Sequence, residues 1–163
     1  MGSGKSAVGA ALARRLGRSF VDIDAVVERR LGMAIHEIFE LEGEAAFRDT
    51  EQDELRRVSA ADDLVVATGG GLFSDRTNRE LIEKTGGTSV FLDQPWDVII
   101  GRLGDHDTGR PKFVDPRQAH ALYLRRLPDY LEATVRLQVR GDEGPLEVAG
   151  RIADVLAEAA CAS

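Results

Sequence analysis

The stretch Met1-Gly2-Ser3-Gly4-Lys5-Ser6 opens the chain and decides its fold class. Gly4-Lys5-Ser6 matches the end of the phosphate-binding loop motif G-x-x-x-x-G-K-[ST]. Glycines let successive backbone N–H groups turn toward a phosphate, the lysine adds a positive charge, and the serine hydroxyl can ligate Mg²⁺. The run at 7–16 predicts a helix whose N-terminus favours an anion. These residues favour a nucleotide-binding α/β protein. The alternative is that the sequence G-S-G-K-S occurs here in an ordinary turn.

The motif is incomplete at its start. The full pattern needs another glycine before Met1 and, before that glycine, a buried strand. We therefore expect the natural start to lie upstream of Met1. If the chain truly begins there, its sheet lacks a central strand, and the neighbouring strands leave backbone groups unpaired.

Composition excludes several classes of protein. The 163 residues are 43% hydrophobic and 30% charged, which is typical of one globular domain spanning 1–163. The formal net charge of -7 argues against nucleic acid as the main partner. No apolar stretch is long enough to cross a membrane. The only cysteine, Cys161, cannot form an internal disulfide. We expect a cytoplasmic monomer acting on a small molecule.

Apolar runs alternate with helical patterns along the chain, which predicts an α/β fold with a central parallel sheet between two helical layers. A polar, glycine-containing loop at about 104–115 is typical of a lid over an active site. The expected strands are 19–24, 64–68, 88–92 and 135–139. The expected helices are 7–16, 25–31, 33–39, 42–60, 76–84, 95–103, 116–130 and a last one from 145.

Asp22 and Asp24 end the first of these strands. Residues two apart on a strand face the same side, and the carboxyl end of a parallel strand borders the ligand site of an open sheet. One carboxylate could hold Mg²⁺ while the other accepts a proton from a hydroxyl nucleophile. The alternative is structural, a strand end followed by a helix N-cap, a position that aspartate also favours.

Gly69-Gly70-Gly71 follows the most apolar strand. Three glycines in a row favour close approach of a ligand to the backbone over a simple tight turn. Arginine binds carboxylates and phosphates through a bidentate fork, although any single arginine is more often a surface charge. The candidate arginines for such binding are Arg48, Arg102, Arg110 and Arg126.

Together these features resemble the shikimate kinase family, over nearly the whole chain but without the first strand and the start of the phosphate loop. The motifs that carry the resemblance are G-S-G-K-S at 2–6, F-V-D-I-D at 20–24, G-E-A-A-F-R at 43–48, A-T-G-G-G at 67–71, G-R-P at 109–111 and R-R-L-P-D-Y at 125–130.

The resemblance implies ATP-dependent phosphorylation of the 3-hydroxyl of shikimate, with Mg²⁺, on a P-loop kinase fold like that of nucleoside monophosphate kinases. It implies that Asp24, Lys5 and Arg110 are catalytic, and that Ser6 and Asp22 hold the metal. The implied shikimate-binding residues are Asp24, Arg48, Gly70, Gly71 and Arg126. The implied ATP-binding residues are Gly2, Ser3, Gly4, Lys5, Ser6, Ala7, Arg102 and Arg110.

Two departures from the family pattern concern single residues. Ala7 stands where the family usually has threonine. The spacing between Arg102 and the lid is one residue longer than in the family pattern, which weakens the assignment of Arg102 to the adenine. Two other interpretations of the function stay open. The first is another small-molecule P-loop kinase, such as a gluconate or nucleoside monophosphate kinase. The second is a degenerate relative that binds ligands without catalysis.

Overall fold

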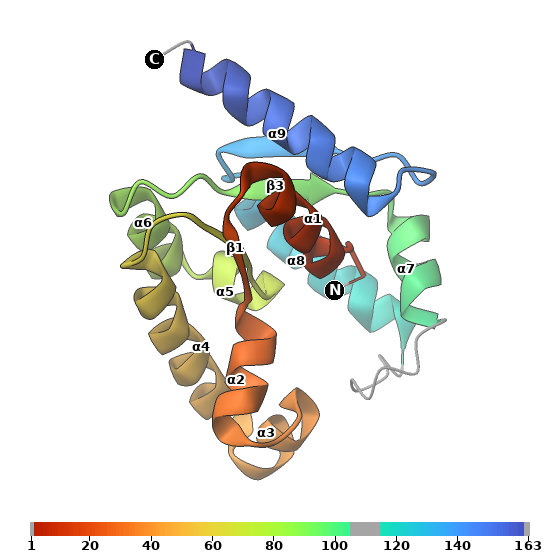
Figure 1. Ribbon diagram of the computed structural model, residues 1–163. Helices are drawn as coiled ribbons and strands as arrows, with labels where there is room; N and C mark the ends of the chain where they lie inside the picture. The colour runs from red at the N-terminus through yellow and green to blue at the C-terminus, as the bar shows by residue number, and fades with distance from the viewer. Residues whose placement is uncertain (1, 105–114, 162–163) are drawn as a thin grey trace.

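The strands of the computed structural model lie between two layers of helices (Figure 1). Residues 2–104 and 115–161 are described. The strands are β1 (Ser19–Asp22), β2 (Leu64–Ala67), β3 (Val90–Asp93) and β4 (Val135–Gln138). The helices are α1 (Lys5–Leu16), α2 (Ile23–Leu31), α3 (Ile35–Leu41), α4 (Gly43–Ser59), α5 (Gly70–Ser74), α6 (Arg76–Lys84), α7 (Trp96–Gly104), α8 (Pro116–Tyr130) and α9 (Pro145–Cys161).

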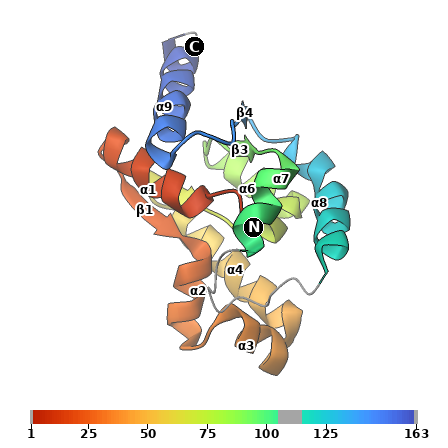
Figure 2. The ribbon, with the colours of Figure 1, turned by 90° about the vertical axis from the view of Figure 1, so that its right-hand side faces the viewer.

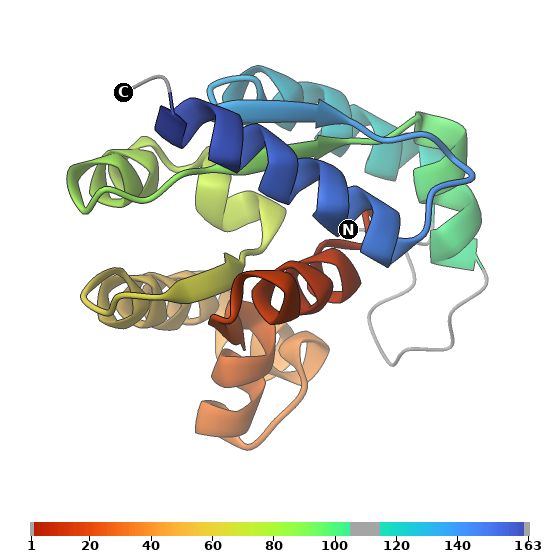
Figure 3. The ribbon, with the colours of Figure 1, turned by 45° about the horizontal axis from the view of Figure 1, so that its top comes forward.

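Alternate residues of β2 pack into different cores, as the period of two in a strand requires. In β2, Val65 packs with α1 and α9, whereas Val66 packs with α2, α4 and α5. In β3, Val90 and Leu92 join the first core, and the ring of Phe91 lies 5.4 Å from that of Tyr130 in α8. Figure 3 shows α1 and α9 side by side in front of the strands. The expected three-layer α/β class is confirmed.

The strands form two parallel pairs. In the part of the chain that the structure describes, β1 pairs with β2, from Ser19 opposite Leu64 to Asp22 opposite Ala67. The second pair is β3 with β4, from Val90 opposite Val135 to Asp93 opposite Gln138. No hydrogen-bonded ladder joins β2 to β3 among these residues, so the expected single sheet is divided in two.

Most predicted elements are found within one or two residues of their predicted limits. Helix α8 begins at Pro116 and ends at Tyr130 as predicted, with Pro128 inside its last turn. Three differences matter below. Strand β1 stops at Asp22, Gly70 starts the unpredicted helix α5, and α7 starts at Trp96, directly after Pro95.

Helices α2 and α3 extend away from the strands as a separate helical region (Figures 1 and 2). They pack on α4 through Ile23, Val27, Ile38 and Phe47, all of which are buried. Gly32 ends α2 with a left-handed φ of 69°, a conformation that glycine adopts without strain. No helix in residues 2–104 or 115–161 is both long and apolar enough to cross a membrane.

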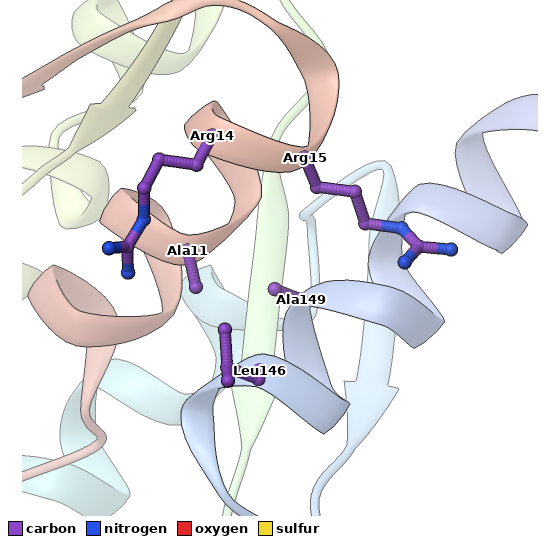
Figure 4. A pocket seen from close by; sticks show the side chains of 5 residues that line it. All are labelled: Ala11, Arg14, Arg15, Leu146 and Ala149. Atoms are coloured by element: carbon purple, nitrogen blue, oxygen red, sulfur yellow. The ribbon is translucent and has the colours of Figure 1, made fainter.

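A shallow hollow separates the outer surfaces of α1 and α9. It is lined by Ala11, Arg14, Arg15, Leu146 and Ala149. In Figure 4 the two arginine side chains leave α1 in different directions. None of the predicted site residues lines this hollow, so the candidate site lies elsewhere.

Two helical glycines should respond oppositely to replacement by alanine. A β-carbon at Gly9 would lie 2.6 Å from the Phe20 ring, whereas one at Gly150 in α9 meets nothing within 4 Å. We expect Gly150→Ala to raise the free energy of unfolding by up to about 1 kcal/mol, because alanine is the better helix former. We expect Gly9→Ala to lower it by about 1–2 kcal/mol, because the overlap must be relieved by shifting packed atoms.

Urea denaturation of both variants measures this difference. An equal gain in stability for Gly9→Ala and Gly150→Ala would contradict the packing of α1 on β1 described above.

Candidate functional site

The phosphate loop runs into the first turn of α1. Gly2 and Gly4 have positive φ angles of 72° and 78°, which glycine adopts at little cost. Gly4 is the N-cap of α1, and no side chain caps the helix. Its first N–H groups are therefore open to an anion. Lys5 and Ser6 occupy the first turn, and the adjacent Ala7 is exposed.

The two aspartates do not share one strand, so that expectation was wrong. Asp22 is the last residue of β1 and the N-cap of α2, and its Oδ1 accepts a hydrogen bond from the Asp24 backbone N–H at 3.1 Å. Asp24 lies in the first turn of α2. The cap satisfies a helix N–H that would otherwise lack a partner, which is why the strand ends two residues early.

Both aspartates nevertheless reach the phosphate loop. The Ser6 hydroxyl donates a hydrogen bond to Asp22 Oδ2. The Lys5 ammonium lies 3.6 Å from Asp24 Oδ2. Asp24 is only 8% exposed. The structure thus places one hydroxyl and two carboxylates around the start of α1.

Oxygen donors of this kind fit Mg²⁺. No group of three or more His, Cys, Asp or Glu side chains suited to a metal occurs in the described residues. Mg²⁺ does not need one, because it is usually held by one or two carboxylates together with water and substrate phosphates. Ser6 and Asp22 are adjacent and suit that role.

Each glycine of the 69–71 loop faces a polar side chain at very short range. A β-carbon on Gly69 would lie 2.6 Å from Glu51 Oε1 and 3.1 Å from Asp24 Oδ1. A β-carbon on Gly70 would lie 2.3 Å from the Tyr130 hydroxyl oxygen. The glycines therefore allow side chains from other helices to reach the backbone, an arrangement that the sequence did not predict.

Gly71 opens onto a network of charges on α4. Its β-carbon would lie 2.6 Å from the Arg48 guanidinium. Arg48 donates hydrogen bonds to Glu51 Oε2 at 2.7 Å and to Glu44 Oε1 at 3.0 Å. Burial of Arg48 lowers its pKa, but the hydrogen bonds and charges of Glu51 and Glu44 outweigh burial, and the pKa is raised.

Glu51 was not predicted as a site residue. It is 1% exposed, and its Oε1 has no hydrogen-bond partner in the described part of the chain. Burial raises the pKa of Glu51, and the hydrogen bond and charge of Arg48 offset this only in part. The position of Glu51 three residues after Arg48, on one helix face, was the signal that sequence reasoning could have used.

Arg126 and Tyr130 bring α8 to the same loop. Arg126 Nη1 would lie 3.8 Å from a β-carbon on Gly70. Burial raises the pKa of the Tyr130 phenol, while the charge and hydrogen bond of Arg126 act in the opposite direction. Tyr130 belongs to a quoted motif but was given no role from the sequence, because its packing against Gly70 is a tertiary contact.

Arg102 reaches the phosphate loop from α7. Its Nη1 would lie 3.3 Å from a β-carbon on Gly4. Arg110 and the loop around it, at 105–114, lie outside the described residues, as does Met1. The structure thus groups the other predicted site residues around the phosphate loop and the 69–71 loop.

The family model described as shikimate kinase matches residues 1–157. A shikimate kinase of Salinibacter ruber is 40% identical over 96% of this chain and 80% of its own length. One from Synechococcus sp. strain CC9605 is 42% identical, over 96% of this chain and 78% of its own.

Solved structures agree with these matches. Shikimate kinase from Acinetobacter baumannii, in complex with shikimate, superposes with a TM-score of 0.89 and 34% identity, over 97% of this chain and 89% of that one. The enzyme from Aquifex aeolicus gives a TM-score of 0.85 and 33% identity, over 98% and 94%. A gluconokinase from Sinorhizobium meliloti, at 24% identity and a TM-score of 0.52, shares the fold alone. The chain belongs to the shikimate kinase family.

Proposed function

We propose that Lys5, Asp24 and the arginines of α4 and α8 carry out the reaction of this family, the ATP-dependent phosphorylation of shikimate at its 3-hydroxyl, which gives shikimate 3-phosphate and ADP. The contact between Lys5 and Asp24, 3.6 Å long, carries the proposal. It joins the phosphate loop directly to the cluster around Gly69 and Arg48. A phosphate donor and a small acid bound at these two places would meet at Asp24.

The phosphate end of the site consists of the loop and its neighbours. The N–H groups at the start of α1 and the Lys5 ammonium bind the β- and γ-phosphates of ATP. The backbone of 2–6, with the exposed Ala7 beside it, surrounds them. Ser6 and Asp22 would hold Mg²⁺. When bound, Mg²⁺ neutralises the charge that develops on the transferred phosphoryl group.

Asp24 is the proposed base. It is almost buried and lies between the phosphate-binding lysine and the Gly69 backbone. A carboxylate there can accept the proton of the attacking hydroxyl and hold that hydroxyl in line with the phosphate. Phosphoryl transfer depends mainly on such positioning and on charge neutralisation.

The other end binds the acceptor. Arg48 and Arg126 grip the carboxylate of shikimate, while the backbone at Gly70 and Gly71 contacts its ring hydroxyls. Glu51, which is 1% exposed, supports this end indirectly, because its Oε2 accepts a hydrogen bond from Arg48 at 2.7 Å and so holds the guanidinium in place. A polyhydroxylated acid would supply the carboxylate for the arginines and the hydroxyls for the glycine backbone.

Further roles follow the family pattern. Arg110 steadies the γ-phosphate from the lid at 104–115, and Arg102 flanks the adenine. The enzyme acts as a single-domain cytoplasmic monomer, with small molecules rather than nucleic acids or membranes as partners. Light scattering after size exclusion, which would give twice the 17.7 kDa chain mass for a dimer, tests the monomer.

We expect ADP release with MgATP and shikimate in a coupled assay, and no release with gluconate. Asp24→Asn should keep the fold and lower kcat by about 10²–10⁴-fold, because it removes the proton acceptor. Turnover of gluconate would instead favour the alternative that the protein is a gluconate kinase. A folded wild-type protein that binds shikimate without turnover would favour the degenerate binding protein.

Replacing an arginine that binds the acceptor should weaken the binding of shikimate and not that of ATP. We expect Arg48→Met to raise KM for shikimate by about tenfold or more while leaving KM for ATP unchanged, since a charged hydrogen bond contributes about 1.5–3 kcal/mol. Arg56→Met is the matched control, because Arg56 lies on the same helix and pairs with Asp53 at the exposed surface. Equal effects of the two substitutions would contradict the assignment of Arg48.

The close approach of Tyr130 to Gly70 predicts that a second substitution can restore activity lost by changing Gly70. Gly70→Ala should abolish most activity, because its methyl group would overlap the Tyr130 hydroxyl. Adding Tyr130→Phe removes that oxygen and should restore part of kcat/KM, with Tyr130→Phe alone as the reference. A double variant as inactive as Gly70→Ala would show that this hydroxyl is not the obstacle.

A further inference from the structure

Gln94 connects the phosphate loop to Arg102. It lies between the end of β3 and the start of α7 and is 4% exposed. Its Nε2 donates a hydrogen bond to the Ser3 carbonyl at 2.9 Å. Its Oε1 accepts one from Arg102 Nη1 at 3.1 Å. Both ends of one buried amide are therefore used, one on the loop and one on the arginine beside it.

The two partners determine how the amide is oriented. A backbone carbonyl only accepts hydrogen bonds, and a guanidinium only donates them. The residue at 94 must therefore offer a donor to Ser3 and an acceptor to Arg102. Glutamate lacks the donor, and methionine lacks both the donor and the acceptor. Substitution by either residue therefore tests the two hydrogen bonds of Gln94 with little change in side-chain shape.

The bond to Ser3 also orients the next peptide N–H group. The peptide bond is planar and trans, so the Ser3 carbonyl and the Gly4 N–H point in opposite directions. With the carbonyl held by Gln94, the Gly4 N–H faces away from Gln94. Gly4 has a φ of 78° and no side chain of its own, and among the described residues no side chain caps α1.

The backbone on both sides of Gln94 is well held. The Asp93 carbonyl accepts a hydrogen bond from the Val139 N–H at 2.9 Å, which continues the β3–β4 ladder. The Pro95 carbonyl accepts from Val98 and Ile99, in the first turn of α7. Gln94 is therefore a fixed point against which a glycine-rich loop can be positioned.

We propose that Gln94 is a positioning residue for the nucleotide. It holds the phosphate loop in its anion-binding conformation and keeps the Arg102 guanidinium against the loop at Gly4. This rests on the proposed function only in taking the loop to be the ATP site. Loss of Gln94 should weaken nucleotide binding and leave shikimate binding intact.

Calorimetric titration of the full chain with MgADP, and separately with shikimate, tests the proposal. We expect Gln94→Met to weaken MgADP binding about tenfold, the loss typical of one to two hydrogen bonds, and to change shikimate binding less than about twofold. Gln52→Met is the matched control. Gln52 also donates to an oxygen, that of Asn78, and accepts from an arginine, Arg56, but on α4.

Two more variants separate positioning from a general loss of packing. Gln94→Glu keeps the shape and the acceptor for Arg102 but sets a carboxylate against the Ser3 carbonyl, so it should bind MgADP at least as weakly as Gln94→Met. In a double-mutant cycle, Gln94→Met should cost less in an Arg102→Met background than alone, because one of its two bonds is already lost.

The outcomes are distinguishable. MgADP binding unchanged in Gln94→Met, equal weakening in Gln52→Met, or parallel loss of shikimate binding would each overturn the role of Gln94, even if the wild type turns over shikimate. A wild type that binds MgADP but shows no turnover would count against the proposed function and leave the Gln94 comparison valid. A wild type that does not bind MgADP would overturn both.

Discussion

The backbone at Gly69–Gly71 has no room for a β-carbon, and the rest of the site depends on that constraint. Glu51, Tyr130 and the Arg48 guanidinium each occupy the space that a side chain on one of these glycines would fill. They come from α4 and α8, which otherwise belong to different parts of the fold. Because only glycine permits such an approach, the three glycines allow α4 and α8 to pack close to the end of β2.

The site lies at the carboxyl ends of three strands, which come from the two parallel pairs. Asp22 ends β1, Gly69 follows β2, and Gln94 follows β3. In open α/β structures this edge is where ligands bind, because helices start there and their N–H groups face outward. Because no hydrogen-bonded ladder joins β2 to β3 in the described residues, other contacts must hold the two strand pairs together at this edge. The bond from Gln94 to Ser3 is one of them.

Charge balance explains how an acidic protein can bind anionic substrates. The chain carries a formal net charge of -7, yet the site presents Lys5, Arg48 and Arg126. Lys5 lies near Asp24, and Arg48 pairs with Glu51 and Glu44. A buried charge is costly unless it is paired, so these carboxylates stabilise the cations before substrate binds.

The sequence by itself determined the fold class, the order of the elements and the chemistry of the phosphate loop. These depend on local signals: hydrophobic periodicity, glycine and proline at element ends, and short motifs with a physical mechanism. Helix α8 runs from Pro116 to Tyr130 as predicted, with Pro128 in its last turn. The same local rules placed Asp22 and Asp24 on one strand, whereas in the structure Asp22 is the N-cap of α2 and Asp24 lies in its first turn.

Only the tertiary structure decided which residues meet. Nothing local distinguishes Gln94 from a surface glutamine, or Tyr130 from an ordinary core tyrosine. Their roles arise from partners 91 and 60 positions away, Ser3 and Gly70. The sequence predicted close approach of a ligand at the glycine loop, and the structure adds that side chains from α4 and α8 approach the same backbone. Such contacts depend on how the helices pack around the strands, and packing is a property of the whole chain rather than of any segment.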